Sequence, residues 1–178
     1  MKIVIIAGST RAGASSTKAA RYAAGLMQEQ GHEVNMVDLH QHRLPIYCSD
    51  DAVQVPEVIS LRQAVLEANA IVLSTPEYHG SISGALKNAL DFLSAEQFDS
   101  KLVLSISSAG GAVGVNSLQH LQTIVRNVHG INCPEWISVG GAQREFGPDG
   151  APASEGVQLR IHHAVKYFLE LAQKLLKD

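Results

Sequence analysis

The stretch KIVIIAGSTRAGASST, residues 2–17, decides the architecture of the chain. Residues 2–7 are an apolar, largely β-branched run too short for a helix, and they predict a strand buried on both faces. Gly8 then opens a loop rich in glycine and serine, and the helix predicted after it ends at Gly31. A hydroxyl residue is expected to cap that helix: Ser15, Ser16 or Thr17. A buried strand followed at once by a helix is the first half of a unit that builds parallel sheets.

The same alternation continues along the chain. Strand-like runs occupy 32–39, 70–75, 101–108 and 133–140, and helical runs occupy 57–69, 81–98, 115–128 and 154–177. The last strand is weakened by Pro134, and residues 40–55 and 140–153 are turn-rich connections. This order predicts an α/β fold, a three-layer sandwich with helices on both faces of a five-stranded parallel sheet. Right-handed crossovers favour the strand order 2-1-3-4-5, which places a ligand crevice at the carboxyl ends of the first and third strands.

Composition and charge describe one ordinary domain, residues 1–178. The chain is 46% apolar and 17% charged with a net charge of −3, so it lacks the basic field that holds nucleic acid. Cys48 and Cys133 form no CxxC pair and predict no disulfide framework, which favours a reducing compartment. We expect no signal peptide and no membrane span, because the apolar runs are short. The sequence therefore predicts a cytoplasmic protein without nucleic-acid or membrane partners.

The loop after the first strand has the outline of a phosphate-binding loop without its lysine. Gly8, Gly13 and Ser15 keep the spacing of that motif, but Ala14 stands at the lysine position. The start of the following helix offers free N–H groups and a partial positive charge, which suit one terminal phosphate. Arg11 is predicted to supply the charged contact instead. Hydroxyls come from Ser9, Thr10, Ser15, Ser16 and Thr17. The alternative is a serine-rich turn that caps its helix and binds nothing.

A second motif, TPEYHGSISGALKNALDFL at residues 75–93, follows the third strand. With the first loop it resembles the NADPH-dependent FMN reductase family, particularly its azobenzene-reductase members. The family's Gly-Ser-x-Arg loop with following Ser/Thr residues matches 8–11 and 15–17. Its Pro-Glu-Tyr-x-Gly-Ser turn matches 76–81, and its Leu-Lys-Asn-Ala-x-Asp motif matches 86–91. The chain departs from the family at three places: His79 where many relatives have Asn, Ser83 where many have Pro, and Phe92 where many have Trp.

The resemblance implies a flavodoxin-like fold with an FMN site. The residues that would hold the phosphate are Ser9, Arg11, Ser15, Ser16 and Thr17. Those that would border the flavin ring are Pro76, Glu77, Tyr78, His79, Gly80 and Ser81. The loop at 107–111 would complete the other edge of the ring through Ser108, Gly110 and Gly111, whereas Ser107 itself reads equally well as part of a plain turn.

The resemblance also implies an oxidoreductase. NADPH or NADH would deliver hydride to FMN, and the electrons would pass to a small-molecule acceptor such as an azo compound, a quinone or free flavin. Because the cofactor carries the chemistry, no catalytic side chain is required, and Glu77 need not be a general acid. A homodimer or homotetramer is implied, with the helix that holds Lys87 and Asp91 at the dimer contact, although these two can simply form a surface ion pair.

Two other functions compete with this interpretation. One is a flavodoxin-like electron carrier with protein partners, which the modest charge and the lack of an aromatic residue in 107–111 disfavour. The other is a phosphate-binding module without redox chemistry. Two histidine pairs could suggest metal sites, but solvated surface histidines are favoured: His40 with His42, and His162 with His163. Two loop arginines, Arg43 and Arg144, leave open which of them, if either, meets the 2′-phosphate of NADPH.

Overall fold

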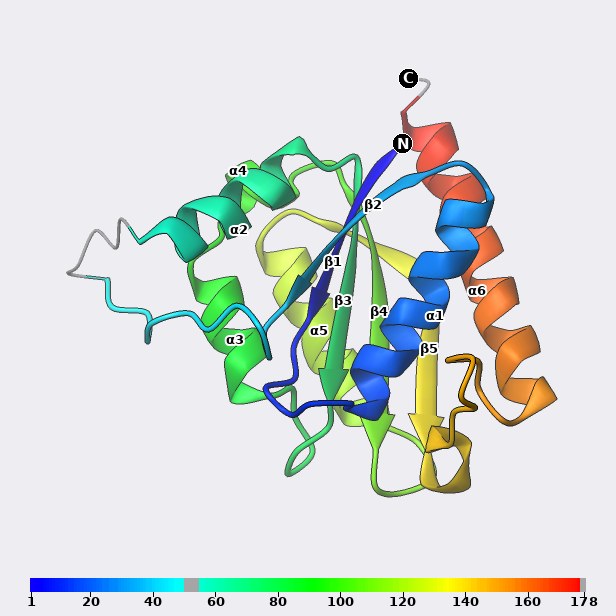
Figure 1. Ribbon diagram of the computed structural model, residues 1–178. Helices are drawn as coiled ribbons and strands as arrows, with labels where there is room; N and C mark the ends of the chain where they lie inside the picture. The colour runs from blue at the N-terminus through cyan, green and yellow to red at the C-terminus, as the bar shows by residue number, and fades with distance from the viewer. Residues whose placement is uncertain (50–54, 177–178) are drawn as a thin grey trace.

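The strands form one parallel sheet in the order β2-β1-β3-β4-β5, as the sequence predicts (Figure 1). The computed structural model describes residues 1–49 and 55–176, so the predicted helix end at Lys177 and part of the 40–55 connection lie outside the described residues. The strands are β1 (Lys2–Ala7), β2 (Glu33–Asp38), β3 (Ala70–Pro76), β4 (Leu102–Ala109) and β5 (Ile131–Gly140). The helices are α1 (Ser15–Glu29), α2 (Pro56–Glu67), α3 (Gly84–Asp91), α4 (Ala95–Phe98), α5 (Val115–Asn127) and α6 (Glu155–Leu175), with the 3₁₀ helix η1 (Gly141–Arg144) after β5.

Helices cover both faces of the sheet, and each face has its own apolar core (Figure 1). On one face α1 and α6 pack over a cluster that includes Ile5, Leu104 and Phe168. On the other face α2, α3 and α5 pack over a cluster that includes Ile6 and Leu73. Strands β3 and β4 are buried along their whole length. This burial explains why these strands are apolar runs and not alternating ones, since neither face meets water.

The predicted helix at 81–98 is two helices. Phe92 ends α3 as its C-cap, and Ser94 starts α4 through a capping box with Gln97. In that box the side chain of Gln97 accepts the N–H of Ser94 at 2.9 Å. Phe92 and Leu93 stay buried across the break. The apolar spacing therefore continues where the helix does not, which is why periodicity alone predicts one helix.

Strand β5 begins at Ile131, two residues before the predicted start, and it includes Pro134. It is the outer strand beside β4, and the register shifts between Val103 and Ser105 opposite the proline. A proline is tolerated there because an edge strand has unpaired N–H positions. Pro134 weakened the strand prediction, but it does not prevent a strand here because β5 lies at the edge of the sheet.

All strands run in one direction, so the loops after β1, β3 and β4 meet at the edge drawn at the bottom of Figure 1. This is the carboxyl edge, and the strand order reverses between β1 and β3 there. Within the described ranges, no helix combines the length and the apolar character needed to cross a membrane.

Candidate functional site

The loops after β1 and β3 are packed against each other, as the predicted crevice requires. Gly8 donates its N–H to the carbonyl of Ser74 at 2.7 Å. A Cβ on Gly8 would lie 2.6 Å from the Cβ of Leu86 and 2.8 Å from the Ser74 carbonyl, so only glycine permits this approach. The Ser83 hydroxyl donates to the Gly8 carbonyl and accepts the N–H of Leu86 at 3.0 Å. Ser83, which departs from the family pattern, thus caps α3 and ties that helix to the first loop.

The start of α1 has no side-chain cap. The prediction that Ser15, Ser16 or Thr17 caps the helix is wrong, because the helix begins at Ser15 and the N-cap residue is Ala14, which makes no capping bond. The first turn also holds no acidic residue. The first amides of α1 therefore keep the free donors and the positive dipole end that bind anions.

Two hydroxyls in this first turn are buried without a hydrogen-bond partner among the described residues. They are the Oγ of Ser16 and the Oγ1 of Thr17, whose residues are 0% and 5% exposed. Buried polar groups in folded proteins are nearly always paired, so an orphan of this kind needs an explanation. The Ser16 carbonyl accepts a bond from the Ser74 hydroxyl at 2.9 Å, which fixes this turn against β3. Among the described residues, the first amides of α1 and these two hydroxyls are thus left as unsatisfied donors at the start of the helix.

The rest of the first loop also suits this role. The buried Ser9 hydroxyl accepts the N–H of Arg11 at 3.2 Å, and Gly13 adopts a positive φ of 64°. The Arg11 side chain is exposed at this edge. Within the described part of the chain no contact engages its guanidinium. A forked cation is therefore free beside the uncapped helix start.

His40 supports the same loop from the turn after β2, although the sequence alone does not assign it to the site. Its Nδ1–H donates to the carbonyl of Thr10 at 2.8 Å. The buried carboxylate of Asp38 accepts the N–H of His40 at 3.0 Å and a guanidinium bond from Arg21 at 2.8 Å. No local signal could have found His40, because its partner lies thirty residues earlier in the chain.

Lys18 is a second residue at this loop that the sequence reasoning missed. Its Cε lies 4.0 Å from the position of a Cβ on Gly13, and its Nζ lies 5.9 Å from the centroid of the Phe146 ring. The cation therefore stays close to the loop and rests against an aromatic face. The position of Lys18 in the first turns of the predicted helix is the sequence signal that could have assigned it to this loop.

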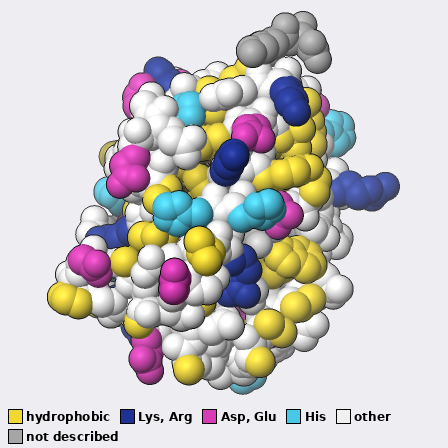
Figure 2. All heavy atoms as spheres, turned by 90° about the vertical axis from the view of Figure 1, so that its right-hand side faces the viewer, with side chains coloured by type: hydrophobic (Ala, Val, Ile, Leu, Met, Phe, Trp, Pro, Cys, Tyr) yellow, Lys and Arg dark blue, Asp and Glu magenta, His cyan; other side chains and the backbone are white. Residues whose placement is uncertain are grey.

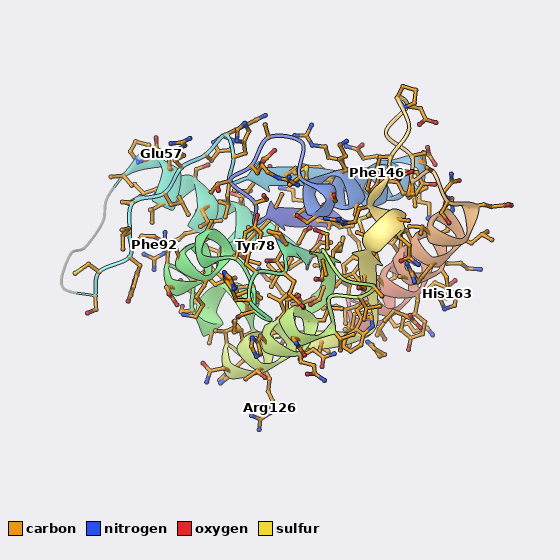
Figure 3. All side chains as sticks on the ribbon, turned by 90° about the horizontal axis from the view of Figure 1, so that it is seen from below. Glu57, Tyr78, Phe92, Arg126, Phe146 and His163 are labelled. Atoms are coloured by element: carbon orange, nitrogen blue, oxygen red, sulfur yellow. The ribbon has the colours of Figure 1, made fainter. Side chains whose placement is uncertain are left out.

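The loop after β3 is a tight hairpin. Tyr78 and Ser81 exchange both backbone hydrogen bonds at 3.0 Å, with His79 at φ 52° and Gly80 at φ 72° between them. Two successive positive φ angles define a type I′ turn, which favours Asn, Asp or His followed by Gly. This explains how His79 can stand where many relatives have Asn. Tyr78 is 51% exposed and lies near the centre of the carboxyl edge (Figure 3).

Glu77 is held by α5 and is not a free acid. Its N–H donates to the carbonyl of Ser108 at 2.7 Å, which continues the pairing of β3 with β4 beyond Pro76. Its Oε2 accepts the N–H of Ser117 at 2.9 Å in the first turn of α5. A carboxylate at this position satisfies a helix donor and the helix dipole. The carboxylate of Glu77 thus has a structural contact with α5, and that it need not be a general acid stays a prediction.

The loop after β4 lies beside the hairpin and presents glycine. Gly110 and Gly111 are exposed, with open space where their Cβ atoms would be. Below them Ser107 is buried, and its hydroxyl hydrogen-bonds the hydroxyl of Ser117 at 2.7 Å. Ser107 thus supports the turn, as the plain interpretation expected, while Ser108 joins Glu77. The three predicted segments of the site meet at one edge.

The remaining candidates lie elsewhere. Lys87 and Asp91 form the expected ion pair at 2.6 Å. His162 hydrogen-bonds Tyr22 at 3.0 Å, and His163 lies 3.5 Å from Glu135. Figure 2 shows histidine side chains among charged and hydrophobic groups on the face that carries α6. Among the described residues, no group of three or more His, Cys, Asp or Glu side chains is placed to hold a metal ion.

The fold and this edge together define a class of protein. A doubly wound parallel sheet with an uncapped helix start at its switch point is typical of proteins that bind mononucleotides. A family model described as NADPH-dependent FMN reductase matches residues 1–144. The chain belongs to the NADPH-dependent FMN reductase family, as the two motifs indicated.

Curated relatives agree with this membership. The FMN-dependent NADPH-azoreductase of Staphylococcus saprophyticus subsp. saprophyticus is 35% identical over 167 residues, which cover 90% of this chain and 89% of the relative. The NADPH azoreductase of Bacillus sp. (strain OY1-2) is 30% identical over 180 residues, with 98% of each chain covered.

Solved structures show the same fold at lower identity. FerB, a flavoenzyme NAD(P)H:(acceptor) oxidoreductase from Paracoccus denitrificans, superposes with a TM-score of 0.82 at 22% identity over 97% of each chain. An azoreductase from Bacillus anthracis superposes with a TM-score of 0.62 at 15% identity, covering 98% of this chain and 99% of that one. The flavodoxin-like fold predicted from the sequence is confirmed.

Proposed function

We propose that this chain is a single FMN-binding domain, residues 1–178, that takes hydride from NADPH or NADH and reduces a small-molecule acceptor. The observation that carries the proposal is the uncapped start of α1, where the buried hydroxyls of Ser16 and Thr17 have no partner among the described residues. Family membership supplies the identity of the ligand, since relatives are named FMN-dependent NADPH-azoreductases.

The residues at this start fit the phosphate of FMN. The amides of the first turn and the hydroxyls of Ser16 and Thr17 would donate to phosphate oxygens, and Ser9 would hold the loop around them. Arg11 would add a charge-assisted contact, since no other described group occupies its guanidinium. Ser15, the first residue of α1, would contribute through its backbone and side chain. We propose these as the phosphate-binding residues.

The hairpin and the loop after β4 fit the flavin ring. Residues 76–81 would border one edge of the ring, and Ser108, Gly110 and Gly111 would border the other, where open space above the glycines permits a flat ligand to approach the backbone. FMN, when bound, supplies the hydride and electron transfer chemistry. The chain's own part is to orient the ring with backbone amides and a rigid type I′ turn.

The contact that the Glu77 side chain makes supports a reaction in which FMN, and not an acidic side chain, would carry the chemistry. Glu77 is the acidic residue of the hairpin, and its carboxylate is bound to the first turn of α5. It would therefore position the hairpin against α5 and would not transfer a proton. We propose azo compounds, quinones or free flavin as the acceptors. The names of the relatives, which are azoreductases, support the azo compounds.

We further propose a homodimer or homotetramer in the cytoplasm. Next to the hairpin, an apolar hollow of about 520 Å³ runs between α3 and α5, lined by Ile82, Thr123 and Ile124 among others. Such a hollow on α3 supports the dimer contact that the family resemblance implies. Sedimentation of the purified protein would give the assembly directly.

The test is anaerobic reduction of the purified protein. Protein loaded with FMN should be bleached at the flavin bands by NADPH or NADH, and each acceptor should then restore the oxidised spectrum. An electron carrier would show almost no direct reduction by nicotinamide without a reductase. A preparation that binds no FMN would overturn the proposal and favour a module that binds phosphate without redox chemistry.

A further inference from the structure

A hollow of about 340 Å³ opens beside the first loop, on the side of β2 and α3. Thr10 of that loop forms one wall. Leu39, Leu44 and Ala85 give it an apolar floor, and His42 and Arg43 stand at its rim. A volume of this order is at the lower end of the range for pockets that hold small molecules, which begins at about 300 Å³.

The charges around the hollow favour an anionic group. Among its described lining residues none carries a carboxylate, whereas Arg43 and His42 both bring nitrogen donors. Arg43 is exposed, and in the described part of the chain no hydrogen bond or ion pair occupies its guanidinium. A free guanidinium fork binds a phosphate through paired hydrogen bonds, and the apolar floor suits a flat base.

The segment that follows Arg43 and Leu44 is held in place against α3. The side chain of Asn88 on α3 accepts the N–H of Tyr47 at 2.8 Å and donates to the carbonyl of Pro45 at 2.8 Å. The Tyr47 ring packs edge-on against Phe92 with centroids 5.2 Å apart. Because three contacts fix residues 45–47 to α3 and its C-cap, the hollow is a built feature of the fold.

Its position suits the far end of a nicotinamide dinucleotide. Thr10 belongs to the phosphate-binding loop, and Ala85 and Asn88 lie on the helix that follows the hairpin, so the hollow adjoins both segments of the proposed flavin site. Arg144, the other candidate arginine, follows β5 at the opposite end of the sheet, where its Nε donates to the Gly141 carbonyl at 3.2 Å. The two arginines are therefore separated by the full width of the sheet.

We propose that this hollow binds the adenosine 2′-phosphate of NADPH and that Arg43 is the residue that distinguishes NADPH from NADH. An arginine beside a 2′-phosphate is the usual way in which dinucleotide sites accept the phosphorylated form. The inference rests on the proposed oxidoreductase function, and it assigns that function's co-substrate a subsite on this chain.

The first experiment measures binding without turnover. Adenosine 2′,5′-bisphosphate and AMP are titrated by calorimetry into FMN-loaded wild type, Arg43→Ala and the matched control Arg144→Ala. We expect wild type and Arg144→Ala to prefer the bisphosphate. Arg43→Ala should lose about 10- to 150-fold of bisphosphate affinity, the range for a lost hydrogen bond to a charged group, while AMP binding and FMN content stay unchanged.

The second experiment compares kcat/KM for NADPH and NADH in the same three proteins. Arg43→Ala should lower the value for NADPH by a similar factor and leave that for NADH unchanged. Any of four results would overturn the subsite. Arg43→Ala could keep the preference for NADPH, lose activity equally with both nucleotides, or release FMN; or Arg144→Ala could lose the preference for NADPH. If the bisphosphate binds through Arg43 but wild type oxidises neither nicotinamide, the subsite stands and the proposed function fails. If NADH is oxidised but wild type binds the bisphosphate no more tightly than AMP, the subsite is wrong and the proposed function stands.

Discussion

Replacement of Thr17 by valine should make the apoprotein more stable and its FMN binding weaker. The Thr17 hydroxyl is buried without a partner among the described residues, and valine keeps the side-chain shape while removing the oxygen. The two effects have opposite signs because the hydroxyl costs free energy in the apoprotein and contributes hydrogen bonding when phosphate is bound. If the Thr17 hydroxyl served only packing or capping, its removal would not raise the stability of the apoprotein and at the same time lower the FMN affinity.

The magnitudes follow from the burial. A hydroxyl buried without a hydrogen bond costs about 1–3 kcal/mol, so Thr17→Val should raise the free energy of unfolding of the apoprotein by up to that amount. Helix propensities of threonine and valine are similar, so the backbone of α1 contributes little to the difference. Loss of one hydrogen bond to a charged phosphate costs about 1.5–3 kcal/mol, which corresponds to about 10- to 150-fold in FMN affinity.

Two measurements on the same proteins test the reasoning. Urea unfolding of the apoprotein gives the stability change, and flavin-fluorescence titration with FMN and riboflavin gives the affinities, riboflavin serving as the ligand without phosphate. The control is Thr123→Val on α5, where the exposed Thr123 hydroxyl bonds the Gln119 carbonyl at 3.1 Å away from the loop. This control gives the effect of a Thr→Val substitution in a helix where the threonine hydroxyl is exposed and hydrogen-bonded.

The reasoning would be refuted by either of two results. A clear loss of apoprotein stability in Thr17→Val would mean that the hydroxyl has a partner in the apoprotein. An unchanged FMN affinity, or equal losses for FMN and riboflavin, would mean that the hydroxyl does not face the phosphate.

Three further substitutions test other parts of the fold and site. Arg11→Ala should weaken FMN about 10- to 150-fold and riboflavin only slightly in fluorescence titrations, because the exposed guanidinium has no other described partner; equal losses would contradict this. Gly80→Val places a branched residue at φ 72° in the type I′ turn. FMN binding should therefore be lost while the far-UV circular dichroism spectrum is retained, and stoichiometric FMN in the variant would disprove the ring site. Burial raises the pKa of the Cys133 thiol from 9.0 to about 11. The folded state therefore keeps a proton that the unfolded state loses, and wild type should lose about 1.4 kcal/mol of stability per pH unit between about pH 9 and 11 relative to Cys133→Ala; parallel pH curves would exclude this linkage.

Local patterns in the sequence were enough to predict the sheet and the point at which its strand order reverses. Buried parallel strands require continuous apolar runs, and right-handed crossovers leave few orders for five of them, so β1 to β5 and the switch point follow from the spacing of short runs. The two glycine-containing motifs could be placed at that edge for the same reason. Where helix boundaries depend on caps and not on periodicity, as between Phe92 and Ser94, the prediction failed.

The tertiary structure alone decided how the site is assembled. Glu77 caps a helix forty residues later, and His40 holds a carbonyl thirty residues earlier; such partners depend on which loops become neighbours in space, and no spacing in the chain encodes them. The hydroxyls of Ser16 and Thr17 were predicted as caps from residue type, but in the fold they are buried with no partner among the described residues, and Ala14 is the N-cap. Residue type sets what a side chain can bind, while the packing of distant segments determines which groups are already satisfied and which remain free for a ligand.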